Sequence, residues 1–268
     1  MSSTLTYAVQ DSVTMLRRNL KHAIRYPAVG FATAATPILM LLLFAYAFGD
    51  SLGTGLGGTG GTGGSRDVYV NYLTPGIIIM GVAAGSMSTS VAVCTDMTEG
   101  IINRFRTMNI TRSSFLTGHV LGSVIQTMLC VVLVVGAALA VGFRPDANPL
   151  EWLAAAGLLA AIAFSVTWLS VALGLISKTV ESASNKPLLV QFLPFLGSAF
   201  VPAESMSPGL RWFAEYQPFT PMTETVRGLL TGTAIGHDGW IALVWCAVVT
   251  LIGYGWSRSL FHSGTTRR

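Results

Sequence analysis

Long apolar runs that contain almost no charge constrain the fold more than any other feature of the sequence. Each run is about as long as the ~20 residues that an α-helix needs to cross the hydrocarbon of a bilayer. Apart from the start of the fifth, none contains Asp, Glu, Lys or Arg. The runs are 28–48, 75–94, 115–143, 152–177, 179–201 and 240–257. We therefore predict an all-α integral membrane protein with six transmembrane helices, formed by residues 28–260.

The charged residues predict the orientation of these helices. Only 10% of the 268 residues are charged, against roughly 25% in soluble domains. With both termini on one side, that side holds twelve of the 16 basic residues and four of the 12 acidic ones. Basic residues concentrate on the cytoplasmic side of membrane proteins. We predict a multi-pass protein of the cytoplasmic membrane with both termini cytosolic, and no nucleic-acid partner.

The segment 95–114 lies between the second and third runs, and its charges place it in water at the inner face. Ile101, Phe105 and Met108 recur at helical spacing, while Arg104 and Arg106 lie off that apolar face. This pattern indicates a short amphipathic helix that packs against an apolar surface. A plain connection between two spans would not need such a face, so we predict a docking helix.

The amino-terminal residues 1–27 have apolar positions at helical spacing and a basic opposite face. That face carries Arg17, Arg18, Lys21 and Arg25, a pattern typical of helices that lie against anionic lipid headgroups. The alternative is a signal peptide cleaved after the sequence AYA at 45–47. Its polar region and its apolar run are both longer than is usual for a signal peptide. A basic cytosolic tail, 261–268, ends the chain.

Outer segments differ in character. Residues 49–74 are rich in glycine, and we expect a flexible loop there. Gly53, Gly55 and Gly58 fit a GxGxxG pattern, but the strand required before a nucleotide-binding turn is missing. We expect the second span to begin at Thr74-Pro75, with a capping threonine before a proline in the first turn.

The fifth run is unusual because its uninterrupted apolar part, 188–201, is too short to cross alone. It must include the polar turn 179–187, which contains Glu181 and Lys186. Two further helix starts follow, at Ser207-Pro208 and Thr220-Pro221. The segment 202–238 is too polar to span and too apolar to lie free in water. We predict a pair of re-entrant helices on the outer side, with a loose outer loop as the alternative.

Several blocks of the sequence carry a resemblance to a known family. They are YLTPGI at 72–77, 100–106, 112–118, 198–202 with Met206, 213–220 and 227–232. In these blocks the chain resembles the permeases of ABC-2 type transporters, close to daunorubicin-resistance-type drug export permeases. Two departures concern the docking region: the family often has proline where Asn109 stands, and often an acidic residue shortly after Gly118, where this chain has His119.

This resemblance implies a permease that dimerises and binds one cytosolic ABC ATPase per permease, in contact with membrane lipids. The partner ATPase would use ATP and Mg, and this chain would bind no cofactor and no metal. The coupling residues would be Glu99, Gly100, Ile101, Arg104, Phe105, Arg106, Met108 and Arg112. The outer re-entrant pair would close the pathway with Pro202, Met206, Phe213, Pro218, Thr220 and Arg227.

The source of energy can also be argued from the residues themselves. Ion-driven transporters usually carry ionisable groups within the membrane, whereas these spans offer only His119 and Gln126 as notable polar groups. A hydrogen-bonded structural histidine is the favoured interpretation of His119 over a proton relay. The chain also has no P-loop, so energy would have to come from ATP hydrolysis by a partner.

We therefore predict the permease subunit, itself not an enzyme, of an ATP-driven exporter for a hydrophobic or amphipathic compound such as a drug, an antibiotic or a lipid. Met80, Met87, Phe192 and Phe195 are candidate pathway residues, although such residues also serve ordinary helix packing. One alternative is a membrane anchor or immunity subunit without transport. Another is an intramembrane enzyme using Ser86, Ser88 or Ser90 with His119 as base, although serines there more often allow close helix packing. The three cysteines are expected to be packing residues.

Overall fold

The structure is a computed structural model, and it describes residues 27–55, 65–98 and 112–263. Within these ranges the chain is helical, with turns but no strand. The long helices are α2 (Pro27–Leu43), α4 (Ser65–Thr98), α6 (Arg112–Val141), α7 (Pro149–Leu175) and α12 (Asp238–Ser263). The shorter elements are η1 (Phe44–Phe48), α3 (Gly49–Gly55), α8 (Val180–Asn185), α9 (Leu188–Phe192), η2 (Leu193–Leu196), η3 (Ala203–Ser205), α10 (Pro208–Tyr216) and α11 (Phe219–Thr231). The all-α prediction is confirmed for the described residues.

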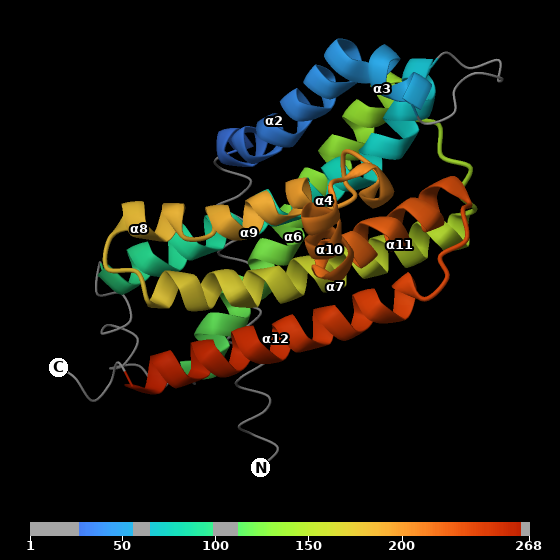
Figure 1. The fold of residues 1–268 in the computed structure, drawn as a ribbon. Coiled ribbons are helices and arrows are strands. Elements are labelled where there is room, and N and C mark those ends of the chain that lie inside the picture. The colour runs from blue at the N-terminus through green and yellow to red at the C-terminus, as the bar shows by residue number, and fades with distance from the viewer. Residues whose placement is uncertain (1–26, 56–64, 99–111, 264–268) are drawn as a thin grey trace.

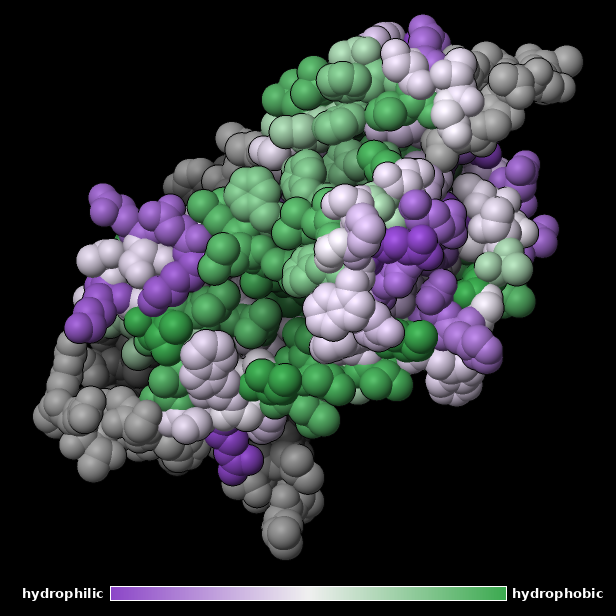
Figure 2. All heavy atoms as spheres, viewed as in Figure 1, coloured by the Kyte–Doolittle hydropathy of each residue, from purple (hydrophilic) through white to green (hydrophobic). Residues whose placement is uncertain are grey.

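Five stretches are long and apolar enough to cross a membrane. They are Thr33–Gly55, Arg66–Thr98, Thr117–Val141, Pro149–Leu175 and Asp238–Leu260. Figure 2 shows apolar side chains over the middle of the bundle, with hydrophilic side chains at the end that carries α8 and at the opposite end. This is the surface expected of a multi-pass membrane protein.

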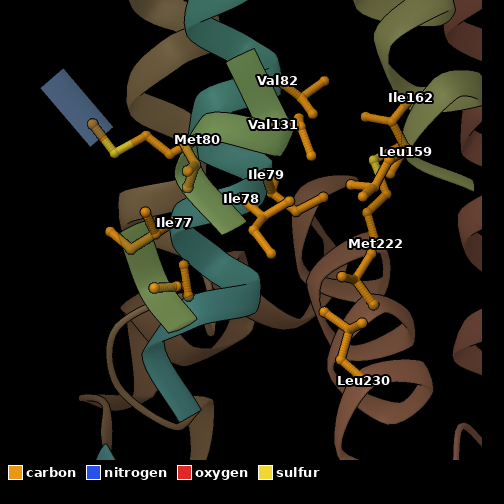
Figure 3. Close-up of a cluster of buried hydrophobic side chains, with 14 of the residues drawn as sticks. Ile77, Ile78, Ile79, Met80, Val82, Val131, Leu159, Ile162, Met222 and Leu230 are labelled. Atoms are coloured by element: carbon orange, nitrogen blue, oxygen red, sulfur yellow. The ribbon is translucent and has the colours of Figure 1, made fainter. Parts of the chain in front are cut away.

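Helix α4 lies at the centre of the arrangement (Figure 1). Of its most apolar window 78% is buried, compared with 17% in α12. It packs against α2, α6, α7, α11 and the short helices α8 and α9. Residues 77–80 of α4 are all buried and meet Val131 of α6, Leu159 of α7 and Met222 of α11 in one core (Figure 3). A helix that is buried over most of its surface is apolar on most of its faces, which agrees with the lack of an amphipathic pattern in its sequence.

The second span does not begin at Thr74-Pro75 as predicted, because α4 starts at Ser65 and continues through Pro75. The Thr74 hydroxyl donates to the Val70 carbonyl at 2.7 Å, and Tyr69 and Leu73 are almost wholly buried. Packing around this turn outweighs the loss of the proline N–H. The predicted loop 49–74 is likewise wrong at both ends, since residues 49–55 and 65–74 are helical.

The fifth run does not form one long helix. It is divided into α8, α9 and η2, with Pro187 between the first two and Pro194 in the third. Lys186 donates from Nζ to the Ile176 carbonyl and to Ser177 Oγ, both at 3.3 Å, and so caps the end of α7. The described residues therefore do not contain six continuous spanning helices, because the fifth segment is a series of short helices.

Two helices, α10 and α11, are present where an outer re-entrant pair was predicted. In α10 only Ala214 is buried, while most of α11 is buried against α4, α7 and α12. Their depth in the bilayer stays a prediction. The predicted amino-terminal helix, the coupling segment from Glu99 to residue 111 and the end of the basic tail lie outside the described residues. The three cysteines are buried and unpaired, as expected for packing residues.

Candidate functional site

A groove of about 770 Å³ lies between α2, α4 and the α9–η2 segment. Its lining is mostly apolar, with hydroxyl and amide groups along one part. The lining residues are Thr33, Thr36, Met40, Met80, Ala84, Met87, Ser88, Val91, Leu188, Gln191, Phe192 and Phe195. A concave apolar site with a few polar groups is the usual form of a small-molecule site, so we take this groove as the candidate functional site.

Helical geometry explains why α4 forms the floor of the groove. Its contributions recur at positions 80, 84, 87, 88 and 91, which is the spacing of one helix face. This face is free because α2 and α9 stand on either side of α4 (Figure 1). Their facing side chains, such as Met40 on α2 and Leu188 on α9, form the walls.

The four candidate pathway residues are brought together by the structure. Met80, Met87, Phe192 and Phe195 all line the groove, although they come from segments about 100 residues apart. Met80 is almost wholly buried, whereas the Phe192 side chain is 57% exposed and free to contact a bound compound. Their role in transport is still a prediction, but their shared position is a structural finding.

Aromatic stacking extends from the wall of the groove into the segment beyond it. The ring of Phe195 stacks on that of Phe200 with centroids 4.7 Å apart and planes 8° apart. Phe200 also packs against Phe44, at the start of the π-helical turn that ends α2, with centroids 4.7 Å apart. Phe200 therefore links the fifth segment to α2 next to the groove.

A buried arginine fixes the same segment to α4 and α11. Arg227 of α11 is only 7% exposed and is paired with Glu224. Its Nη2 donates to the Ser198 carbonyl at 2.8 Å, and its guanidinium carbon lies 3.8 Å from the centroid of the Tyr72 ring. The Tyr72 hydroxyl donates to the same Ser198 carbonyl at 2.8 Å. We call these four residues the Arg227 clamp.

Close backbone packing supports the clamp. A Cβ atom added to Gly76 would lie 2.6 Å from the Ala199 carbonyl oxygen, so only glycine lets the chain after Ser198 approach α4 this closely. Arg227 Nε also donates to the Tyr72 carbonyl at 3.3 Å. The clamp therefore joins three segments that are far apart in the sequence.

The other predicted gate residues are spread over the outer segment. Pro202 and Met206 flank η3, Phe213 is 39% exposed on α10, and Pro218 and Thr220 lie at the start of α11. Of the predicted set, only Arg227 belongs to the clamp. Among the predicted coupling residues only Arg112, the first residue of α6, is described. Sequence reasoning missed Thr33, Thr36 and Met40 of α2, because one helix in isolation gives no indication of which face meets a neighbour.

The residues considered for an intramembrane enzyme have structural roles. Ser86 donates to the carbonyls of Val82 and Ala83, and Ser88 to that of Gly85. Ser90 donates to the Ala183 carbonyl at 2.9 Å. His119 is paired with Asp96 at 2.9 Å, which agrees with a hydrogen-bonded histidine.

Substitution of Arg227 tests the clamp. We expect Arg227→Met to lower stability by about 3–5 kcal/mol, because it leaves a partly buried Glu224 without its cation. Thermal unfolding of the detergent-purified protein measures the loss. The matched control is Arg211→Met, which breaks the exposed Arg211–Glu215 pair on α10 and should cost at most ~1 kcal/mol. Equal shifts for the two variants would show that Arg227 is not a structural anchor.

Comparison with known proteins identifies the family of this chain. Residues 11–231 match the ABC-2 type transporter family. The chain is 28% identical over 246 residues to the "Daunorubicin resistance ABC transporter permease protein DrrB1" of Streptomyces coeruleorubidus, covering 91% of this chain and 83% of that protein. It is also 26% identical over 232 residues to the "Putative transport permease ycf38" of Porphyra purpurea, covering 84% and 75% of the two chains. The chain belongs to the ABC-2 type transporter family and is a membrane permease of that family.

Proposed function

We propose that this chain is the transmembrane subunit of an ATP-driven exporter that moves a hydrophobic or amphipathic compound out across the cytoplasmic membrane. The observation that carries the proposal is the apolar groove on α4, lined by Met40, Met80, Met87 and Phe192. Thioether and aromatic side chains form favourable contacts with apolar and polarisable molecules. The few hydroxyl and amide groups, such as Thr36 and Gln191, would accept a polar end of the same molecule.

The groove favours such a compound over a small charged solute for an energetic reason. No Asp, Glu, Lys or Arg is among the lining residues, so a charged solute would lose its hydration without gaining a partner. The relative from Streptomyces coeruleorubidus is described as a daunorubicin resistance permease, which supports a drug-like molecule. A drug, an antibiotic or a lipid-like compound fits the groove equally well.

The energy would come from a separate cytosolic ABC ATPase that uses ATP and Mg. The ABC-2 type transporter family implies such a partner, and the amphipathic segment with Ile101, Phe105 and Arg104 is the proposed contact. We further propose a complex of two permeases and two ATPases, with both termini of the permease in the cytosol. Leu39 and Leu43 of α2, 64% and 51% exposed, provide apolar surface for lipid or for the second permease. A membrane anchor without transport is the alternative.

Copurification tests the proposed partner. We expect a P-loop ATPase to copurify with the tagged chain from its native membrane, and an Arg104→Glu/Arg106→Glu variant to lose it, because reversing two charges opposes docking. Mass spectrometry of the purified complex measures both. Exposed Arg144, at the opposite face, gives a matched charge-reversal control that should retain the ATPase. Recovery of no ATPase with any form of the chain would contradict the exporter and favour the anchor.

Transport by the groove can be measured separately. In proteoliposomes containing the complex, we expect ATP-dependent movement of the uncharged lipophilic dye Nile red. Phe192→Ala should raise the half-saturating dye concentration about tenfold, since burial of a phenylalanine side chain contributes roughly 1.5–3 kcal/mol.

Leu189→Ala is the control for this measurement. It removes a similar apolar side chain from the same helix, but from a position outside the groove lining. Its half-saturating concentration should stay within about twofold of the wild-type value. Equal effects of the two substitutions, or transport of the highly charged dye carboxyfluorescein in place of Nile red, would contradict the assignment of the groove.

A further inference from the structure

One hydrogen-bonded pair of side chains joins α4 and α6 close to the points where the two helices meet the segment 99–111. His119 Nε2 donates to Asp96 Oδ2 at 2.9 Å, and each side chain is only 14% exposed. Asp96 lies two residues before the last residue of α4, and His119 lies two turns into α6. The pair therefore fixes the separation of the two helices that the segment connects.

Two further contacts between α4 and α6 lie nearer the centre of the bundle. Together with the Asp96–His119 pair they form a line of contacts that we call the seam. Thr89 of α4 donates from Oγ1 to Ser123 Oγ of α6 at 2.7 Å. One turn deeper, a Cβ atom on Gly85 would lie 2.5 Å from Thr127 Oγ1, so the two helices are in close contact there. Packing holds the deeper part of the seam, while at its inner end a directional bond between two ionisable side chains holds it.

The seam and the groove occupy different faces of the same helix. Asp96, Thr89 and Gly85 face α6, whereas the groove is lined by α4 positions such as Ala84 and Met87. A rigid helix transmits a displacement of one end along its whole length. A displacement of α4 and α6 together would thus move the floor of the groove relative to α2 and α9.

We propose that Asp96 and His119 are positioning residues that make α4 and α6 move as one unit when the ATPase acts on the segment between them. The inference rests on the proposed function, because it requires a partner that acts at the inner face. Without the bond, the end of α6 next to the segment could move while that of α4 stays in place, and much less of the displacement would reach the groove. Binding and hydrolysis by the ATPase would continue.

A cysteine reporter in the groove tests this inference. Met87→Cys is introduced into a full-length chain whose Cys94, Cys130 and Cys246 are replaced by alanine, and the chain is assembled with its ATPase. The rate of maleimide labelling is measured with and without ATP and vanadate. With the native pair we expect vanadate trapping to change this rate at least fivefold.

Three variants at Asp96 and His119 distinguish the effect of losing the bond from the effect of misfolding. Asp96→Ala and the apolar double variant Asp96→Leu/His119→Phe should reduce the change to less than twofold, while ATP hydrolysis continues. Replacement of a buried ion pair by apolar residues of similar volume is often neutral for stability, so the double variant keeps the test valid if the single one aggregates. The exchange Asp96→His/His119→Asp restores the bond and should restore the response. Glu215→Ala, which breaks the exposed pair on α10, should leave the response unchanged.

The outcomes distinguish this inference from the function on which it rests. A fivefold response in the apolar double variant would overturn the inference while leaving the exporter intact. Loss of ATPase binding in that variant would also overturn it, since the pair would then act in assembly and not in transmission. If the native chain neither binds nor stimulates an ATPase, the proposed function itself fails.

Discussion

The arrangement depends on the burial of α4 among the other helices. In the hydrocarbon of a bilayer no water is available for backbone groups, so each segment that crosses it must satisfy its own hydrogen bonds. Helix α4 does so over 34 residues and is apolar on every side, with residues 77–80 entirely inside the core. The helices α6, α7 and α11 each pack against a different part of it. Removal of this helix would leave the others without a common surface.

Different faces of α4 make different contacts. One face forms the floor of the groove, a second meets α6 along the Asp96–Gly85 seam, and its outer part is held by the Arg227 clamp. The buried charge of Arg227 would be costly without Glu224 and the Ser198 carbonyl. By binding the Ser198 carbonyl, Arg227 holds the chain between the stacked rings of Phe195 and Phe200. The seam with α6, the Arg227 clamp and the groove are thus joined through α4.

The sequence predicted the helical class. It also predicted four of the five long helices, with most helix ends correct to within a few residues, because apolar length alone determines which segments can cross a membrane. It failed at Pro75, where a rule for helix starts was applied to a proline that lies inside α4, among the buried residues Tyr69, Leu73 and Ile77. It also missed the division of 180–196 into short helices, although Pro187 and Pro194 lie at the breaks. The candidates Met80, Met87, Phe192 and Phe195 share one groove, and their role in transport stays a prediction. The opposing wall from α2 depends on tertiary packing that no single segment encodes.

The central claim is that ATP hydrolysis by a partner changes the width of the groove between α2, α4 and α9. The most direct test is a distance measurement by pulsed electron paramagnetic resonance in the assembled complex. Spin labels are placed at Met40 and Phe192, on opposite walls of the groove. The account predicts that ATP with vanadate shifts the distance distribution when the ATPase is present, and leaves it unchanged when the permease is alone. An unchanged distribution in a complex that hydrolyses ATP would contradict it.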